Sequence, residues 1–465
     1  MKSLNPIRLS GREVLPLIEG GKGISVSNGE SSGAWAAAGG VGTFSAVNPD
    51  ALDEQGSLIP IIYKGKTRRE RHRELIEYAI QGGITQAKIA HERSNGTGHL
   101  HMNVLWEMAA VEEILHGVLE KVSPLIQGVT CGAGMPYRIA QITASYGIYY
   151  YPIVSSGRAF RALWKRAYHK FPEWLGAVVY EDPWRAGGHN GLSNSEDPDK
   201  PEDPYPRVLE LRNVMREFGL NDVPIIMAGG VWYLREWADW IDNPELGPIA
   251  FQFGTRPLLT QESPISDVWK KRLLTLNPGD IYLNRFSPTG FYSSAVSNPF
   301  LDELKERSTH QVAYSITPVG DHTEGFPVGA RGRLVYLTPL DKTMAEAWVK
   351  LGFTEALRTP DSTLIFVTPD KANEIHKDQV DCMGCLSACL FSNWAQNEEG
   401  STGRKADPRS FCIQKTLQAI SHSDEVDTQL MFAGHAAYNF AQDPFYAGGY
   451  IPTVKELVER LQTGD

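Results

Sequence analysis

The sequence has no block of basic residues, no long hydrophobic run and no apolar leader. Its 45 Lys and Arg residues are outnumbered by 55 Asp and Glu residues, which gives a formal net charge of −10. Because nucleic acids and anionic membranes attract basic surfaces, we expect neither as a partner. No apolar stretch approaches the ~20 residues that cross a bilayer. The first residues, MKSLNPIRLSGREVLPL, also lack the apolar core of a signal peptide. We therefore expect a cytoplasmic protein that binds a small molecule.

Cysteine is scarce too, and the few cysteines are crowded together. The chain has five, of which four lie between Cys382 and Cys412. A disulfide framework is not expected in a chain of 465 residues without a secretory signal. The crowding therefore indicates a local need for thiols.

The first 300 or so residues alternate short β-rich apolar runs with amphipathic stretches. Runs such as GAVVY and VPIIMA are typical of parallel strands that are buried on both faces. Strands are predicted near residues 23–26, 42–46, 99–105, 125–129, 148–154, 177–180, 224–227 and 249–253. Eight βα units predict an α/β fold of the (β/α)8 TIM-barrel type, with a doubly wound open sheet as the alternative. We expect the barrel in residues 1–305, and a smaller α+β domain with the cysteines in residues 306–465.

Glycines stand where such a barrel commonly binds phosphate. The seventh predicted strand runs into Ala228-Gly229-Gly230, and the eighth runs into Gly254-Thr255. Glycine allows backbone N–H groups to approach an anion, and these two strand ends form the usual phosphate site of the barrel. Tight βα turns, which also favour glycine, are the alternative explanation.

A histidine between glycines follows the sixth predicted strand. The segment AGGHNG places His189 on the expected catalytic rim of the barrel. Imidazole exchanges protons near neutral pH, so His189 is the candidate catalytic residue. The alternative is a loop histidine that only stabilises a turn.

A second histidine pattern, GHLHMN, lies on the third predicted strand. His99, His101 and Asn103 alternate along the chain, so a strand would turn them to one face. Two histidines so placed could bind the metal of a hydrolase, but further ligands are then needed at later strand ends. His189 is the only later strand-end histidine, and no Asp follows the eighth strand. A metal-dependent hydrolase using His99 and His101 is the least favoured hypothesis.

The crowded cysteines have a recognisable spacing. Cys382, Cys385 and Cys389 would share one face of a helix, and Cys412 follows at a distance. This spacing departs from the paired Cys-x2-Cys of zinc ribbons and is closer to the ligation of a [4Fe–4S] cluster. We therefore expect the four cysteines to hold an iron–sulfur cluster that exchanges electrons with a cofactor or a partner. Zinc binding and structural or redox-active thiols are the alternatives.

Several segments together resemble the nitronate monooxygenase family, formerly called 2-nitropropane dioxygenases. They are PLIEGGKGISVSN, AAAGGVGTFSA, HMNV, GVTCGAGMP, YYPIVSS, EDPWRAGGHNG, VPIIMAGGV, FQFGTRPL and SPTGF, in the family's order over about two thirds of the chain. The resemblance implies a (β/α)8 barrel that holds FMN noncovalently and oxidises alkyl nitronates with dioxygen. It implies His189 as the catalytic histidine. The residues that would contact FMN are Gly20, Gly21, Asn103, Gly188, Ala228, Gly229, Gly230, Gly254 and Thr255.

The chain also departs from the family's pattern. GAGMP at residues 132–136 is more similar to the GAG-x-P segment of flavin-dependent enoyl-ACP reductases. The second hypothesis is therefore an NAD(P)H-dependent flavin reductase of enoyl thioesters or quinones. Glu19 and Lys22 replace the Gln and Met that family members commonly have beside the flavin. DCMGCLSAC resembles the cluster-binding segment of iron–sulfur flavoenzymes on related barrels, although Cys412 lies farther away than in those enzymes.

Overall fold

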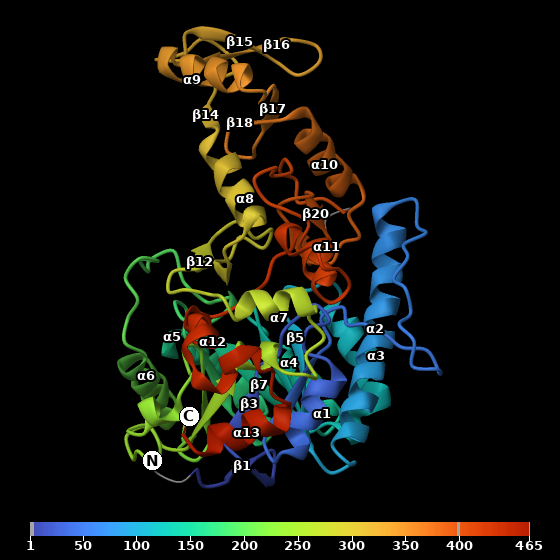
Figure 1. Cartoon of the computed structure of the whole chain (residues 1–465), viewed down its shortest axis with the longest axis vertical. Helices are drawn as coiled ribbons and strands as arrows, with labels where there is room; N and C mark the ends of the chain where they lie inside the picture. Colours follow the sequence, from blue (N-terminus) through green and yellow to red (C-terminus); the bar gives the residue numbers. More distant parts are fainter. Residues whose placement is uncertain (1–3, 398–399, 465) are drawn as a thin grey trace.

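The computed structural model describes residues 4–397 and 400–464, and its centre is a closed barrel of parallel strands (Figure 1). The strands are hydrogen-bonded in the order β10-β11-β3-β4-β5-β6-β7-β8, so eight parallel strands close into one sheet. Their bounds are β3 (Leu17–Glu19), β4 (Val41–Ser45), β5 (His99–Leu105), β6 (Gly128–Gly132), β7 (Tyr149–Val154), β8 (Val178–Glu181), β10 (Ile225–Ala228) and β11 (Ile249–Phe253). The predicted TIM barrel is confirmed.

The first strand was predicted in the wrong place. It lies at Leu17–Glu19, and the residues predicted as a strand, 23–26, form a turn after it. Leu17 and Ile18 are fully buried, whereas the glycines that follow favour a loop. Gly20 and Gly21 therefore follow the carboxyl end of the strand, which is the end where TIM barrels have their active sites.

Helices surround the sheet and cover its outer face (Figure 1). The longest, α2, begins with a capping box in which Thr67 and Glu70 satisfy each other's backbone N–H groups. It packs against its two neighbours in sequence, α1 and α3. The helices around the barrel are α1 (Gly29–Ala37), α2 (Arg68–Arg93), α3 (Val111–Val122), α4 (Ile139–Ser145), α5 (Gly157–Arg166), α6 (Pro204–Glu217) and α7 (Asp267–Leu273).

A hairpin at the start of the chain accompanies the amino end of the barrel. Strands β1 (Ile7–Leu9) and β2 (Arg12–Val14) pair with each other. Leu9 and Val14 belong to a small hydrophobic core with side chains from inside the barrel, among them Tyr151. The Ser10 hydroxyl is hydrogen-bonded to Tyr151. The hairpin therefore plugs this end, and a ligand has access from the carboxyl end of the strands.

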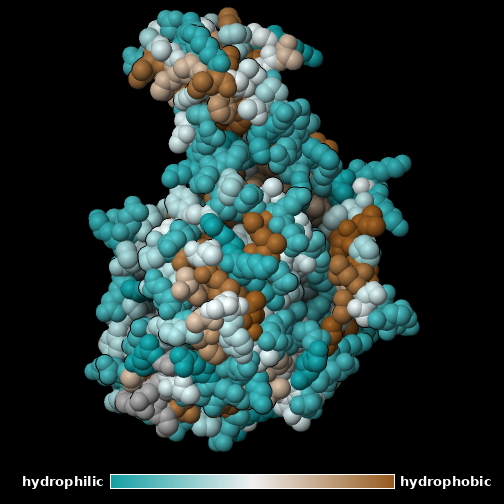
Figure 2. Space-filling view, viewed as in Figure 1, coloured by the Kyte–Doolittle hydropathy of each residue, from teal (hydrophilic) through white to brown (hydrophobic). Residues whose placement is uncertain are grey.

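A small α+β unit projects beyond the barrel, at the top of Figure 1. Its own core contains Val312, Val335 and Phe366. The elements between the barrel and the cysteines are β12 (Ile281–Asn284), β13 (Ser293–Val296), α8 (Pro299–Thr309), β14 (Gln311–Ala313), β15 (Glu324–Val328), β16 (Arg333–Leu337), α9 (Pro339–Lys350), β17 (Glu355–Arg358), β18 (Thr363–Val367) and α10 (Pro369–Val380). Figure 2 shows hydrophobic atoms on this unit, where Ile316, Leu340 and Leu351 are exposed.

After the cysteines the chain returns to the barrel. The last elements are β19 (Ala388–Cys389), β20 (Trp394–Ala395), α11 (Ile413–Gln418), α12 (Asn439–Gln442) and α13 (Val454–Gln462). Helix α13 packs against α1, and Leu457 and Leu461 join the main core of the barrel. The final segment of the chain therefore shares the hydrophobic core of the barrel. In the described part of the chain, no helix is both long and apolar enough to cross a membrane.

Candidate active site

A deep cavity opens at the carboxyl ends of the strands and encloses about 1690 Å³, its open mouth included. The ends of β3, β5, β8, β10 and β11 contribute to its wall. All the cofactor-contacting residues and the catalytic histidine expected from the sequence line it, namely Gly20, Gly21, Asn103, Gly188, His189, Ala228, Gly229, Gly230, Gly254 and Thr255. The structure therefore gathers segments that are up to 235 positions apart around one space.

The glycines after β10 and β11 form an anion cradle, which we define as Gly229, Gly230, Gly254 and Thr255. Gly229 and Gly230 have φ of +94° and +78°, in the left-handed region that favours glycine. A Cβ on Gly254 would meet no atom within 4 Å, so space lies open beside it. Within the described residues, the N–H groups of the cradle donate no hydrogen bond. Free N–H groups beside open space are the geometry that binds phosphate.

The wall of the cavity also carries two amide side chains. Asn103, at the end of β5, accepts a 3.0 Å hydrogen bond from the Thr130 hydroxyl, while its Nδ2 donates to no described residue. Gln252 extends from β11 beside Gly20, and its amide also lacks a hydrogen bond within the described residues. Gly21 packs so tightly on Asn103 that a Cβ would lie 2.3 Å from the Asn103 Cβ. These amides can bind the polar edge of a planar ring.

Glu19 and Lys22 form a buried pair at the floor of the cavity. Lys22 Nζ donates to the Gly20 carbonyl at 2.9 Å and lies 3.5 Å from Glu19 Oε1. Burial raises the pKa of Glu19 and lowers the pKa of Lys22, and the attraction between the two opposes both shifts. The Ser31 hydroxyl adds a 2.7 Å hydrogen bond to Glu19 Oε1. The pair thus brings the Lys22 amine to the cavity, next to the Glu19 carboxyl.

His189 is held in place by backbone and ring contacts. It lies on the short strand β9 (Gly188–His189), which pairs with β13. Its Nε2 is 2.6 Å from the Ser287 hydroxyl. Its ring packs edge-on against Phe432, and the two ring centroids are 5.2 Å apart. Burial lowers the pKa of His189 to about 4, so the ring is neutral at physiological pH. A neutral, fixed imidazole can donate a hydrogen bond or accept a proton.

Sequence reasoning missed Glu181, the last residue of β8. It lines the cavity beside Ala228 of the neighbouring strand β10, and its carboxyl makes no hydrogen bond with any described residue. Burial, together with the nearby Asp182, raises the pKa of Glu181 to about 8. The carboxyl is therefore protonated at neutral pH and can donate a proton. The only available signal was its position at a strand end, directly before the segment that leads to His189.

Sequence reasoning also missed the contribution of the last part of the chain. Met431, Phe432 and Ala433 line the cavity, and Gly434 N donates to Thr255 Oγ1 at 2.9 Å. A Cβ on Gly434 would lie 2.7 Å from the Arg185 carbonyl oxygen. Residues 431–434 therefore cover the anion cradle on the side of Thr255.

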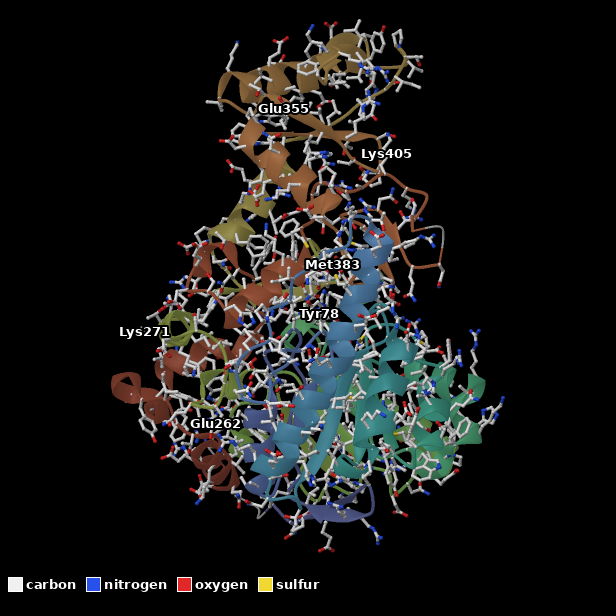
Figure 3. The ribbon with its side chains drawn as sticks, turned by 90° about the vertical axis from the view of Figure 1, so that its right-hand side faces the viewer. Tyr78, Glu262, Lys271, Glu355, Met383 and Lys405 are labelled. Carbon is white, nitrogen blue, oxygen red and sulfur yellow. The ribbon has the colours of Figure 1, made fainter. Side chains whose placement is uncertain are left out.

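Cys382, Cys385 and Cys389 do not lie on a helix. Residues 382–389 are a loop that ends in β19, and only Cys412 borders a helix, at the start of α11. Hydrogen bonds to the barrel and α2 fix the loop in a non-helical path, for instance Ala109 N to Cys385 O at 3.0 Å and Arg71 Nε to Cys382 O at 3.1 Å. In Figure 3, Met383 in this loop lies beside α2, which carries Tyr78. Cys382, Cys385 and Cys389 are buried, and burial, together with the charges of Cys412, Cys389 and Cys382, raises the pKa of Cys385.

The two histidines of β5 do not form a metal site. His99 Nε2 and His101 Nε2 are 3.1 Å apart and buried in the amino half of the barrel, away from the cavity. Within the described residues, no three His, Cys, Asp or Glu side chains are placed to share one metal ion. The metal-dependent hydrolase is therefore not supported, because its two histidines lack a third ligand and access to the open end.

Comparison with known proteins gives one family and several similar structures. A profile of the family described as nitronate monooxygenase matches residues 118–464. No curated protein sequence matches the chain. FabK from Thermotoga maritima is 14% identical, with a TM-score of 0.50, over 97% of this chain and 92% of that chain.

Two further structures are similar. The enoyl reductase domain of MlnA, from the macrolactin biosynthesis cluster of Bacillus amyloliquefaciens, is 13% identical, with a TM-score of 0.53, over 97% of this chain and 93% of that chain. A nitroalkane oxidase from Streptomyces ansochromogenes is 18% identical, with a TM-score of 0.45, over 64% of this chain and 79% of that chain. The likenesses to FabK and to the MlnA domain extend over nearly the whole chain and support the barrel fold.

Proposed function

The chain belongs to the nitronate monooxygenase family, and on this premise we propose that it is an FMN-dependent oxidoreductase that oxidises alkyl nitronates with dioxygen. The observation that carries the proposal is the cavity itself, in which an anion cradle with free N–H groups and a fixed, neutral histidine face the same space. A phosphorylated cofactor fits the cradle, and a small anionic substrate fits the space beside His189.

The residues present fit FMN. Gly229, Gly230, Gly254 and Thr255 would hold the phosphate. Asn103 and Gln252 would donate from their free amides to the polar edge of the ring system. When bound, FMN supplies the redox chemistry by accepting electrons from the anionic substrate. The protein's part is to place the substrate beside the ring and to exclude water from it.

His189 and Glu181 would handle the substrate's charge and protons. His189 Nε2 and the Ser287 hydroxyl share one hydrogen bond, which orients the imidazole toward the cavity. As a neutral ring it can donate to the oxygen atoms of a nitronate without carrying a charge of its own. Glu181 is protonated at neutral pH, so it does not repel an anion and can donate to it as well.

Flavin analysis of the purified full chain tests the proposal at its first step. We expect a yellow protein that releases FMN on denaturation, identified by mass spectrometry. Anaerobic mixing with an alkyl nitronate should reduce the bound flavin, and air should restore it with consumption of oxygen. A colourless protein that takes up no added FMN would contradict the proposal.

The second candidate is an NAD(P)H-dependent flavin reductase of enoyl thioesters or quinones. The observation that favours it is the GAGMP segment, because Gly132 and Ala133 line the cavity and Ala133 adopts a left-handed φ of +54°. A backbone held in that region marks a loop that the surrounding structure fixes. Bleaching of the flavin by NADH or NADPH, but not by an alkyl nitronate, would favour this candidate over the first.

Replacement of Glu181 by Gln should change the pH dependence of the reaction. Above a pH of about 8 the wild-type carboxyl loses its proton and repels an anionic substrate. We therefore expect kcat/KM for the nitronate to fall by about tenfold per pH unit above that point. The E181Q variant carries no such charge, so this fall should disappear from its profile. The exposed Glu236→Gln is the control and should keep the wild-type profile; an unchanged profile in E181Q would remove Glu181 from substrate binding.

A further inference from the structure

The segment SPTGF, at residues 287–291, forms a turn between β12 and β13 beside His189. Gly290 N donates to the Ser287 carbonyl oxygen at 3.0 Å and closes the turn. Gly290 has a φ of +78°, in the region that favours glycine. Strand β13 continues from the turn and pairs with β9, in a register that places His189 opposite Ser293. The backbone therefore fixes the turn and the imidazole relative to each other.

Two hydroxyl groups of the turn form a short chain of hydrogen bonds that ends at His189. Ser287 Oγ lies 2.6 Å from His189 Nε2 and 2.8 Å from Thr289 Oγ1. Backbone N–H groups also donate to both hydroxyls, Thr289 N to Ser287 Oγ at 3.3 Å and Phe291 N to Thr289 Oγ1 at 3.2 Å. Ser287 is buried, so its hydroxyl must find its partners within the protein.

The hydrogens of this chain can be arranged in two ways, because each hydroxyl has one hydrogen to donate. In the first, Thr289 donates to Ser287 and Ser287 donates to His189 Nε2, so the imidazole proton is on Nδ1. In the second, His189 Nε2 donates to Ser287 and Ser287 donates to Thr289. The Thr289 hydroxyl hydrogen then has no partner among the described residues. The first arrangement uses both hydroxyl hydrogens and is therefore favoured.

The distance between Ser287 and His189 favours the same arrangement. N–H donors commonly lie about 2.7–3.2 Å from oxygen, whereas hydroxyl donors approach an acceptor to about 2.5–3.0 Å. A separation of 2.6 Å therefore suits a hydroxyl that donates to Nε2. Burial lowers the pKa of His189 to about 4, so the ring carries a single proton at neutral pH. Nδ1 makes no hydrogen bond with any described residue, and the ring lines the cavity.

We propose that Ser287, supported by Thr289, fixes the tautomer of His189 and makes the imidazole a hydrogen-bond donor to the substrate through Nδ1. His189 then donates to an oxygen of an anionic substrate, and it has no lone pair at Nδ1 with which to remove a proton from a neutral one. Ser287 and Thr289 are positioning residues, because they act through His189. The inference rests on the proposed function for the identity of the anion, whereas the tautomer is a property of the chain alone.

The nitrogen-15 spectrum of the histidine rings in the full chain tests the proposal. For His189 we expect an unprotonated nitrogen far downfield of the protonated one and coupled to both ring C–H protons, which identifies it as Nε2. The His189→Gln variant, or His189→Asn if the first folds poorly, assigns these signals among the 12 histidines by their loss. An unprotonated Nδ1, or two protonated nitrogens at neutral pH, would overturn the proposal. The spectrum needs neither flavin nor substrate, so its failure and failure of the proposed function are distinguishable.

Variants of the turn test the role of Ser287 and of the donated hydrogen bond. In Ser287→Ala the ring should lose its fixed tautomer, and kcat/KM for the nitronate should fall by about tenfold, since one hydrogen bond to a charged group is weakened. Ser287→Thr keeps the hydroxyl and should restore both properties. A tautomer unchanged in S287A would overturn the role of Ser287. A changed tautomer with unchanged kcat/KM would overturn the role of Nδ1 as the donor.

Ser410→Ala is the matched control for a purely structural effect. Ser410 is also buried, and its hydroxyl donates to the Phe286 carbonyl oxygen at 2.6 Å, directly before the turn. The variant therefore removes a hydrogen bond to the same segment without touching the chain that ends at His189. We expect lower stability with an unchanged tautomer and unchanged kcat/KM. The same loss of tautomer in S410A as in S287A would overturn the proposal, because general loosening of the turn would then explain both.

Discussion

The His189→Ala variant should lose between about 100-fold and 10,000-fold in turnover while it keeps its FMN. His189 faces the substrate side of the cavity, and the anion cradle that would hold the cofactor is formed by other residues. Removal of the imidazole therefore takes away a hydrogen-bonding group beside the substrate space and leaves cofactor binding intact. Steady-state oxygen consumption and the flavin absorbance of the same preparation measure the two properties.

Two further variants separate catalysis from folding. His376→Ala removes an exposed histidine on α10 and should behave as wild type. Ser287→Ala removes the 2.6 Å partner of His189 Nε2 and should cost less turnover than H189A, because the ring loses its orientation but remains. If H189A turns over at the wild-type rate, His189 has no part in the reaction.

Gly229→Ala should weaken FMN binding by about 10-fold to 100-fold. An alanine at φ +94° is strained, and its Cβ would lie 3.0 Å from the Ala186 backbone nitrogen. Relief of this strain moves the N–H groups of the anion cradle, and a loss of about 1–3 kcal/mol corresponds to the expected range. Fluorescence titration of the stripped protein with FMN gives the dissociation constant.

Gly219→Ala is the matched control. Gly219 has a φ of +76°, and a Cβ there would meet no atom within 4 Å. It follows α6, away from the cavity. The variant therefore has a similar strain from alanine at a positive φ but does not disturb the cradle. We expect lower stability with unchanged FMN affinity. Equal loss of affinity in both variants would mean that general destabilisation, and not the cradle, explains the result.

The sequence predicts the barrel well because each strand is marked locally. Two strands, His99–Leu105 and Ile249–Phe253, have the predicted bounds. The prediction of the first strand was wrong because the strand has only three residues and a glycine-rich turn follows it. The spacing of Cys382, Cys385 and Cys389 suits a helix, but contacts with α2 and the barrel, far away in sequence, hold this segment as a loop.

The residues of the candidate site also fall into two groups, those that the sequence predicts and those that it does not. His189 and the glycines of the anion cradle stand in short motifs at strand ends, where their role follows from the topology of the barrel. Glu181 carries no motif of its own, and its raised pKa depends on burial that only the folded chain creates. Phe432 and Gly434 reach the cavity through contacts with His189 and Thr255, more than 170 positions earlier. Spacing in the sequence contains no trace of such contacts.

The segment that closes over the anion cradle has a consequence for biogenesis. Gly434 N donates a hydrogen bond to Thr255, so the cradle is covered only after most of the chain has left the ribosome. At about 5–20 residues per second, the gap between Thr255 and Gly434 takes roughly 10–40 seconds to synthesise. During that time the nascent barrel stands with its phosphate end open, and a cofactor that enters can leave again. Retention of the cofactor is thus tied to the end of translation.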